Sequence, residues 1–167
     1  SSSNPSINTH AEITERSGLL VAIDGGRRYQ FSHLTLQEFL AAKQLQSNET
    51  GLLERYRKAP DDWREVVKLW CGLPHDCTRM IKDLRQTDSL LAFECISDAE
   101  QVEEAMWRAL LEEFKPRLED SGTSGIAIVR TFGILGADPR PRGQVALDYL
   151  KTLLAEVPNS QPRYEAA

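Results

Sequence analysis

The amino-acid sequence predicts a mainly α-helical protein that has a β-hairpin near its N-terminus and an array of antiparallel helices after it. Two observations support this fold class. Residues 19–32 form two short strand-like stretches around Asp24-Gly25-Gly26, which supplies the positive-φ positions that a tight hairpin needs. From residue 35 onward, apolar residues recur at helical spacing, and the connections between the predicted helices are short.

The second strand leads directly into a helix. Residues 28–33 alternate between polar and apolar or aromatic side chains, which is typical of a strand with one buried face. Thr35 and Glu38 then have the spacing of a capping box, and Leu34 and Phe39 have the spacing of a hydrophobic staple. We therefore expect a helix over residues 35–46. Four side chains of this region are expected in the core: Tyr29, Phe31, Phe39 and Leu40.

Helical periodicity continues to the end of the chain. Asp62 and Glu65 have the pattern of a helix N-terminus, and Gly72 and Pro74 are expected to end that helix. The stretch from Ile126 to Leu135 is nearly all apolar, so we expect it to be central. The predicted helices cover residues 10–16, 52–59, 62–71, 77–85, 90–96, 102–114, 126–135 and 146–154. Stacked helical pairs of this kind resemble a HEAT-like solenoid, although no regular internal repeat aligns.

Composition excludes several functional classes. The chain of 167 residues has a net charge of −5, which argues against binding to a nucleic-acid backbone, because such domains usually carry a basic face. Arg27 and Arg28 lie in the hairpin without an accompanying basic helix. No apolar run approaches the ~20 residues of a membrane helix. The three cysteines form no Cys-x-x-Cys pair, which favours reduced, packed thiols in the cytosol.

Two short patterns allow a chemical interpretation that we do not favour. Cys71, His75 and Cys77 could belong to a metal site, but a fourth ligand is missing from the sequence nearby. Asp120-Ser-Gly-Thr123 matches the tetrapeptide of aspartic proteases, but it follows a charged, helical segment instead of an apolar strand. We interpret the first pattern as incidental thiols in a loop and the second as a loop between helices. The three tryptophans, Trp63, Trp70 and Trp107, lie on helical stripes and are expected in the core.

The motif Phe-x-His-x-Thr-x-Gln-Glu-Phe-x-Ala-Ala at residues 31–42 resembles the end of the winged-helix domain in NACHT-type signal-transduction NTPases, a STAND group that includes NOD-like receptors. Arg16-Ser-Gly-Leu-Leu-Val21 and the Gly-Gly turn are similar to the wing hairpin of that family. Weaker similarity to the following helical segments lies in residues 90–95 and 134–140. The resemblance implies that the hairpin is the wing of a partial winged helix.

The resemblance also implies a role for His33. In the family, the histidine of this motif contacts the β-phosphate of bound ADP and helps to hold the closed, inactive state. The chain has no Gly-x-x-x-x-Gly-Lys-Ser/Thr segment and no apolar strand that ends in paired acids. We therefore expect no catalytic residue here, and we assign ADP or ATP with Mg²⁺ to an upstream nucleotide-binding domain of a longer parent protein.

These inferences give an expected organisation. Residues 1–10 would be a disordered linker, residues 11–47 the C-terminal part of a winged-helix domain, residues 48–158 an α-helical domain, and residues 159–167 a disordered tail. The expected function is a non-catalytic, cytoplasmic regulatory segment. It would couple nucleotide state to homo-oligomerisation, by family resemblance in bacterial defence. The alternatives are a stand-alone helical-repeat scaffold that binds a protein partner and, on the tetrapeptide alone, an enzyme.

Overall fold

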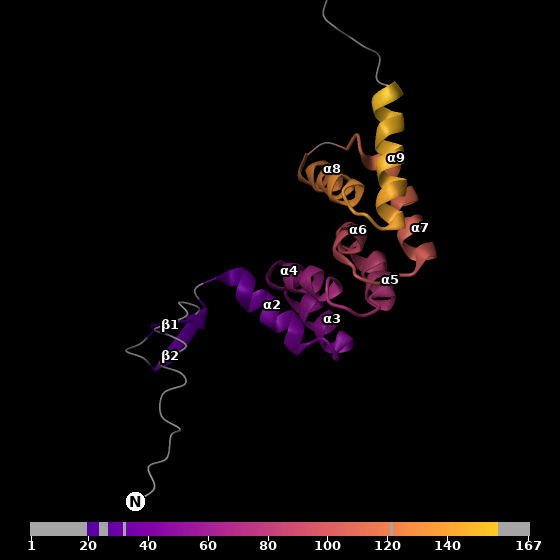
Figure 1. Ribbon diagram of the computed structural model, residues 1–167. Helices are drawn as coiled ribbons and strands as arrows, with labels where there is room; N and C mark the ends of the chain where they lie inside the picture. Colours follow the sequence, from indigo (N-terminus) through magenta and orange to yellow (C-terminus); the bar gives the residue numbers. More distant parts are fainter. Residues whose placement is uncertain (1–19, 24–26, 32, 121, 157–167) are drawn as a thin grey trace, which may run out of the picture. The chain divides into compact units, whose positions relative to one another are not determined.

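The computed structural model describes residues 20–23, 27–31, 33–120 and 122–156 (Figure 1). This part of the chain contains a two-stranded antiparallel hairpin followed by an array of eight α-helices, as the sequence predicts. It divides into two compact units, residues 1–70 and residues 71–167. None of the described helices is both long and apolar enough to cross a membrane.

The hairpin of the first unit pairs strand β1 (Leu20–Ile23) with strand β2 (Arg28–Phe31). Leu20 lies opposite Phe31, and Ile23 lies opposite Arg28. This register confirms the predicted hairpin and its two strands. The predicted turn at residues 24–26 and the predicted short helix at residues 10–16 lie outside the described residues.

Three helices follow the hairpin. The side chain of Asn48 accepts a hydrogen bond of 3.0 Å from the backbone N–H of Gly51 and so caps the second helix, α3 (Glu49–Lys58). The third helix, α4 (Pro60–Cys71), begins two residues before the predicted start at Asp62. A proline is well suited to the first helical position, because the backbone N–H that it lacks would have no partner there. The helices are α2 (Leu34–Gln44), α3 (Glu49–Lys58) and α4 (Pro60–Cys71).

The core of this unit forms where the apolar stripes of α3 and α4 are buried. Trp70 is 2% exposed, and its indole N–H donates to the backbone oxygen of Leu45 at 3.0 Å. This bond satisfies both polar groups in an apolar environment, where an unpaired group would be costly. The stripe on α4 is therefore a core stripe, as predicted, except that Trp63 at its start is only half-buried. The buried apolar residues are Ala42, Leu45, Leu52, Leu53, Tyr56, Val66, Val67 and Trp70.

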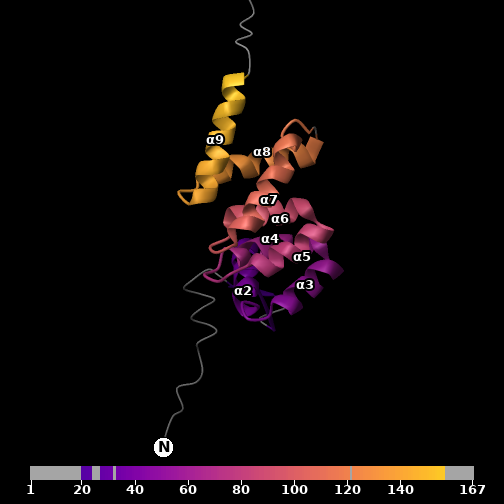
Figure 2. The ribbon, with the colours of Figure 1, turned by 90° about the vertical axis from the view of Figure 1, so that its right-hand side faces the viewer.

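The second unit is built around helix α6, which contacts α5, α7 and α8 (Figures 1 and 2). Phe93 of α6 stacks on Phe114 with ring centroids 4.4 Å apart and lies 5.1 Å from the ring of Phe132. All three rings are fully buried. The elements are α5 (Thr78–Thr87), α6 (Ser89–Asp98), α7 (Glu104–Phe114), the 3₁₀ turn η2 (Lys115–Arg117), α8 (Gly122–Gly136) and α9 (Pro141–Glu156).

Helix α8 is less central than its composition predicts. Ile128, Phe132 and Leu135 are fully buried. The other side of the helix is exposed, and the exposed fractions are 71% for Ile126 and 54% for Val129. The expectation that residues 126–135 are central therefore holds for one face of the helix and not for the other. A helix packed on one side must expose its opposite face, whatever residues that face carries.

Candidate functional site

His33 lies between strand β2 and helix α2. Its backbone is extended (φ −124°, ψ 122°), and its carbonyl oxygen accepts the N–H of Gln37 at 3.3 Å. The side chain is exposed and makes no capping hydrogen bond. His33 is therefore the residue at which the strand ends and the helix begins, and its imidazole remains accessible beside the first turn of α2.

The predicted capping box was wrong in register. The helix begins at Leu34, so His33 occupies the cap position and Thr35 lies inside the first turn. Glu38 lies too far along the helix to reach back to the cap backbone, and the first turn of α2 contains no acidic residue. The helix start therefore has neither the predicted reciprocal cap nor a nearby negative charge. Such a helix start favours an anion, because its first N–H groups and its dipole both attract negative charge.

The apolar residues around His33 were also placed differently from the prediction. Leu34, Phe39 and Leu40 are 68%, 40% and 42% exposed. The predicted staple between Leu34 and Phe39 and the predicted burial of Phe39 and Leu40 were therefore wrong. Phe31 is half-buried, and the Tyr29 side chain lies outside the described residues. Because the helix starts one residue early, Leu34 lies on the helix itself instead of bracing its start from outside.

The three cysteines gather in the second unit, where Cys71 interacts with Cys77 and Cys95. Cys71, Cys77 and Cys95 are buried free thiols. Hydrogen bonds with the thiols of Cys77 and Cys95, together with burial, raise the pKa of Cys71 well above its usual value. Cys77 also donates from Sγ to the backbone oxygen of Gln101 at 3.1 Å. A buried, protonated thiol is a poor nucleophile. Within the described ranges, no group of three or more histidine, cysteine or acidic side chains could hold a metal ion.

The protease-like tetrapeptide spans the start of α8, whose first two residues are Gly122 and Thr123. Asp120 is exposed and pairs with Arg117 through an Nε–Oδ2 distance of 3.1 Å. Gly122 adopts a positive φ of 81° and begins the helix, while Ser121 lies outside the described residues. Asp120 follows a 3₁₀ turn and not the apolar strand that the protease motif requires. The tetrapeptide therefore lacks the context of the protease motif, but it is not wholly the predicted loop, because Gly122 and Thr123 form the start of α8.

A cluster of charges that the sequence did not predict lies in the second unit, on the loop between α8 and α9 and in the first turn of α9. The carboxylate of Asp138 accepts hydrogen bonds of 2.8 Å from Nε of Arg140 and 2.8 Å from Nε of Arg142. Both guanidinium groups also donate to the backbone oxygen of Ala99, beyond the end of α6. The side chains of Asp138 and Arg142 are 6% and 4% exposed. Charged residues in a Pro-Arg-Pro-Arg sequence mark the place, but nothing local reveals a partner about forty residues away.

One comparison with known proteins matches the N-terminal part of the chain. Residues 7–45 match the family model described as the winged helix-turn-helix domain C-terminal to NACHT. No curated protein and no solved structure matches the chain. The matched range contains the motif at residues 31–42 and the hairpin. It supports the prediction that this chain is a C-terminal part of a NACHT-type protein.

Proposed function

We propose that this chain, as a C-terminal part of a NACHT-type protein, is a non-catalytic regulatory segment in which His33 reads the nucleotide bound to an upstream domain. The observation that carries the proposal is the position of His33 within the matched residues, at the start of α2. An exposed imidazole and a helix N-terminus without an acidic first turn are suited to a phosphate group.

The proposed mechanism is a shift between two states of the parent protein. With ADP bound, the imidazole of His33 would contact the β-phosphate and tie the winged helix to the nucleotide-binding domain. The exposed apolar side chains of Leu34, Phe39 and Leu40 lie on the helix that His33 begins and would be covered in the closed state. Exchange for ATP would remove the contact, release the helical segment and permit homo-oligomerisation. A ligand changes this equilibrium only by its different affinity for the two states. A role in bacterial defence and a cytoplasmic location are part of the same proposal.

The nucleotide content of the natural parent protein tests this role. We expect wild-type protein to be purified with ADP and to release it slowly. The change His33→Ala should accelerate ADP release about tenfold or more, because it removes a hydrogen bond to a charged group. The change His33→Gln, which keeps a donor, should give an intermediate rate. The exchange rate of a fluorescent ADP analogue measures the difference.

One control variant and two possible results decide whether His33 has this role. The matched variant Gln37→Ala changes an exposed side chain one turn into α2 and should leave the exchange rate unchanged. Equal exchange rates in wild type and His33→Ala would reduce His33 to a structural residue at the strand end. A parent protein that has no nucleotide-binding domain would contradict the proposal as a whole.

A second candidate function is a helical scaffold that binds a protein partner, and the exposed apolar face of α8 favours it. Ile126, Val129 and Ile134 leave the outer side of this helix largely apolar, and Arg130 is its one charged residue. Exposed apolar faces of this kind mark interaction surfaces. This function is compatible with the first, because it uses the second unit and not His33.

A further inference from the structure

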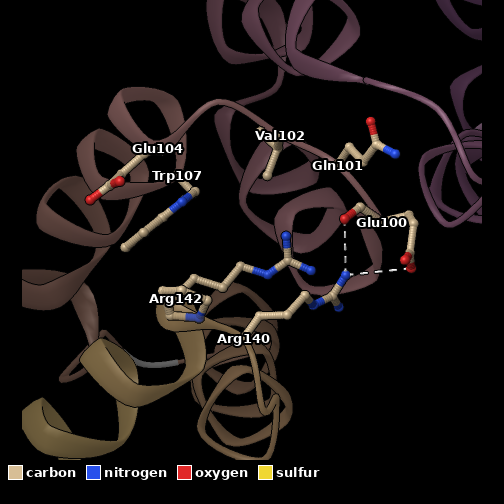
Figure 3. Close-up of a pocket in the computed structure, with 8 residues that line it drawn as sticks. Glu100, Gln101, Val102, Glu104, Trp107, Arg140 and Arg142 are labelled. Carbon is tan, nitrogen blue, oxygen red and sulfur yellow. Dashed lines mark hydrogen bonds and ion pairs between the residues drawn. The ribbon is translucent and has the colours of Figure 1, made fainter.

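A groove of about 360 Å³ lies in the second unit, between the loop that joins α6 to α7 and the start of α9 (Figure 3). Val102 and Trp107 line one side, and Arg140, Pro141 and Arg142 line the other. A volume of this size accommodates a small organic molecule or the end of a peptide. No residue of the NACHT-related match takes part in it.

Two buried residues present unused hydrogen-bond donors in this groove. Arg142 is 3% exposed, and its Nε and Nη2 atoms bond to Asp138 and Ala99. Its Nη1 atom has no partner among the described residues, and Figure 3 shows the guanidinium extending toward Val102. Trp107 is 5% exposed, and its indole N–H has no acceptor in the described part of the chain. Neither atom is a buried donor without a partner, so both reach the open space of the groove, where water or the acceptor group of a bound molecule can accept from them.

The electrostatics of the groove favour a single negative charge. The N-terminus of the 16-residue helix α9 lies at Pro141 and adds a positive dipole end to Arg142. The carboxylates on the rim already have partners. Glu104 lies 2.7 Å from Nε of Arg108, and Glu100 lies 3.7 Å from Nη1 of Arg140. These rim charges leave the central donors available, but they would repel a multiply charged anion such as phosphate.

The walls favour an apolar body next to that charge. Val102, the indole ring of Trp107 and Pro141 offer apolar surface within the same groove as the donors. Ligand sites usually combine such surface with a few polar groups that fix orientation. A carboxylate that bonds to the indole N–H and to Nη1 of Arg142 would place its attached carbon chain against these three residues.

We propose that this groove binds a monocarboxylate with an apolar body, either a small free acid or the C-terminus of a peptide. The carboxylate accepts hydrogen bonds from Trp107 and Arg142, and the apolar body covers Val102 and Pro141. The site does not depend on His33 or on a nucleotide, so the failure of either proposal leaves the other standing.

Titration of the 167-residue chain with 3-phenylpropionate, followed by ¹H–¹⁵N NMR, tests the site. We expect the indole N–H resonance of Trp107 and the backbone resonance of Val102 to shift with saturation, while the indole resonances of Trp63 and Trp70 stay in place. The matched amide, 3-phenylpropionamide, and inorganic phosphate should bind at least tenfold more weakly. The peptide acetyl-Ala-Phe, with a free or an amidated C-terminus, distinguishes a peptide source from a free acid.

Two variants in the groove and one control variant separate binding from folding. Trp107→Phe keeps an aromatic ring and removes the donor, so the affinity read from the Val102 resonance should fall about tenfold. Val102→Glu places a carboxylate in the groove and should abolish binding. Val21→Glu makes the same substitution on an exposed strand position of the first unit and should leave the affinity unchanged.

Three results would overturn the proposal. The first is a folded chain whose Trp107 and Val102 resonances do not move with the acid. The second is equal affinity for the acid and its amide, since the charge would then play no part. The third is unchanged affinity in Val102→Glu, because binding would then lie elsewhere.

Discussion

Asp138 accepts several hydrogen bonds from its neighbours in the second unit. Besides the two guanidinium groups, its carboxylate accepts the backbone N–H of Arg140 at 2.9 Å. Burial raises the pKa of this carboxyl, but the hydrogen bonds from Arg140 and Arg142 outweigh it and hold the pKa below its ordinary value of 3.8. A carboxyl group with a depressed pKa in the folded state stabilises that state above its unfolded pKa, and this contribution is lost as the pH falls through the folded pKa.

We expect Asp138→Asn to lower the free energy of unfolding by about 3 kcal/mol at neutral pH, because it leaves two guanidinium groups without their shared counter-ion. The difference from wild type should narrow below a pH of about 3.8, where the wild-type carboxyl also begins to take up a proton in the unfolded chain. Urea denaturation followed by circular dichroism between pH 7 and pH 3 measures both effects.

Asp148→Asn is the matched control, because this aspartate is exposed on α9 and lies 4.0 Å from Lys151. Its removal should change the free energy of unfolding by less than about 0.5 kcal/mol. Equal losses in the free energy of unfolding for the two substitutions would show that the buried charge cluster stabilises the fold no more than an exposed ion pair does.

Single residues were predictable where the reason was local. The burial of Trp70 and Trp107 follows from helical periodicity, and the structure confirms it. The position of His33 at the strand end was predicted, but the cap was placed at Thr35, because capping patterns do not fix the first helical residue. The pairing of Arg140 and Arg142 with Ala99 was not predicted, since it depends on how α9 packs in three dimensions.

Helix α8 has two faces whose residues are similar and whose environments are opposite. Ile126 is 71% exposed, and Ile128, two positions along, is fully buried. The end of this helix agrees with the prediction, but its start does not, because α8 begins at Gly122 and the apolar stretch begins only at Ile126. Which face it buries does not follow, since an almost uniformly apolar helix has no amphipathic signal to choose one.

The two isoleucines of α8 make a matched pair for measurement. Ile128→Ala should lower the free energy of unfolding by about 2–5 kcal/mol, because it removes buried atoms and leaves a cavity. Ile126→Ala should change it by less than about 0.5 kcal/mol and should weaken retention on a hydrophobic-interaction column. Thermal and urea denaturation report the first quantity. A large loss of stability in Ile126→Ala would mean that the outer face is covered in solution.

At the scale of the whole molecule, the helical array and the N-terminal hairpin were predictable because each element carries its own pattern. The division into compact units was not. The boundary between the two units falls in the sequence between Trp70 and Cys71, the last two residues of α4. The helical stripe of α4 gives no sign of a boundary at this place. The predicted segments at residues 11–47 and 48–158 follow the resemblance to the family, and the NACHT-related match at residues 7–45 covers much of the first of them.

The overall charge leads to a prediction about nucleic acid. Many winged helices bind DNA, but this chain has 25 acidic and 20 basic residues and a net charge of −5. Because non-specific binding to DNA comes from contacts between cations and phosphates, we expect no mobility shift of duplex DNA at physiological salt. An electrophoretic mobility assay with a duplex of mixed sequence tests this, and a shift that weakens with added salt would contradict it.

The three buried thiols of the second unit allow the opening of its core to be measured by their rate of alkylation. Cys71, Cys77 and Cys95 are shielded from solvent, and the thiol of Cys71 is held protonated by its neighbours. An alkylating reagent can therefore reach them only when the surrounding helices separate, so the rate of modification reports how often that separation occurs. The alkylation rate of these natural cysteines therefore measures how often the core opens, and no introduced label is needed.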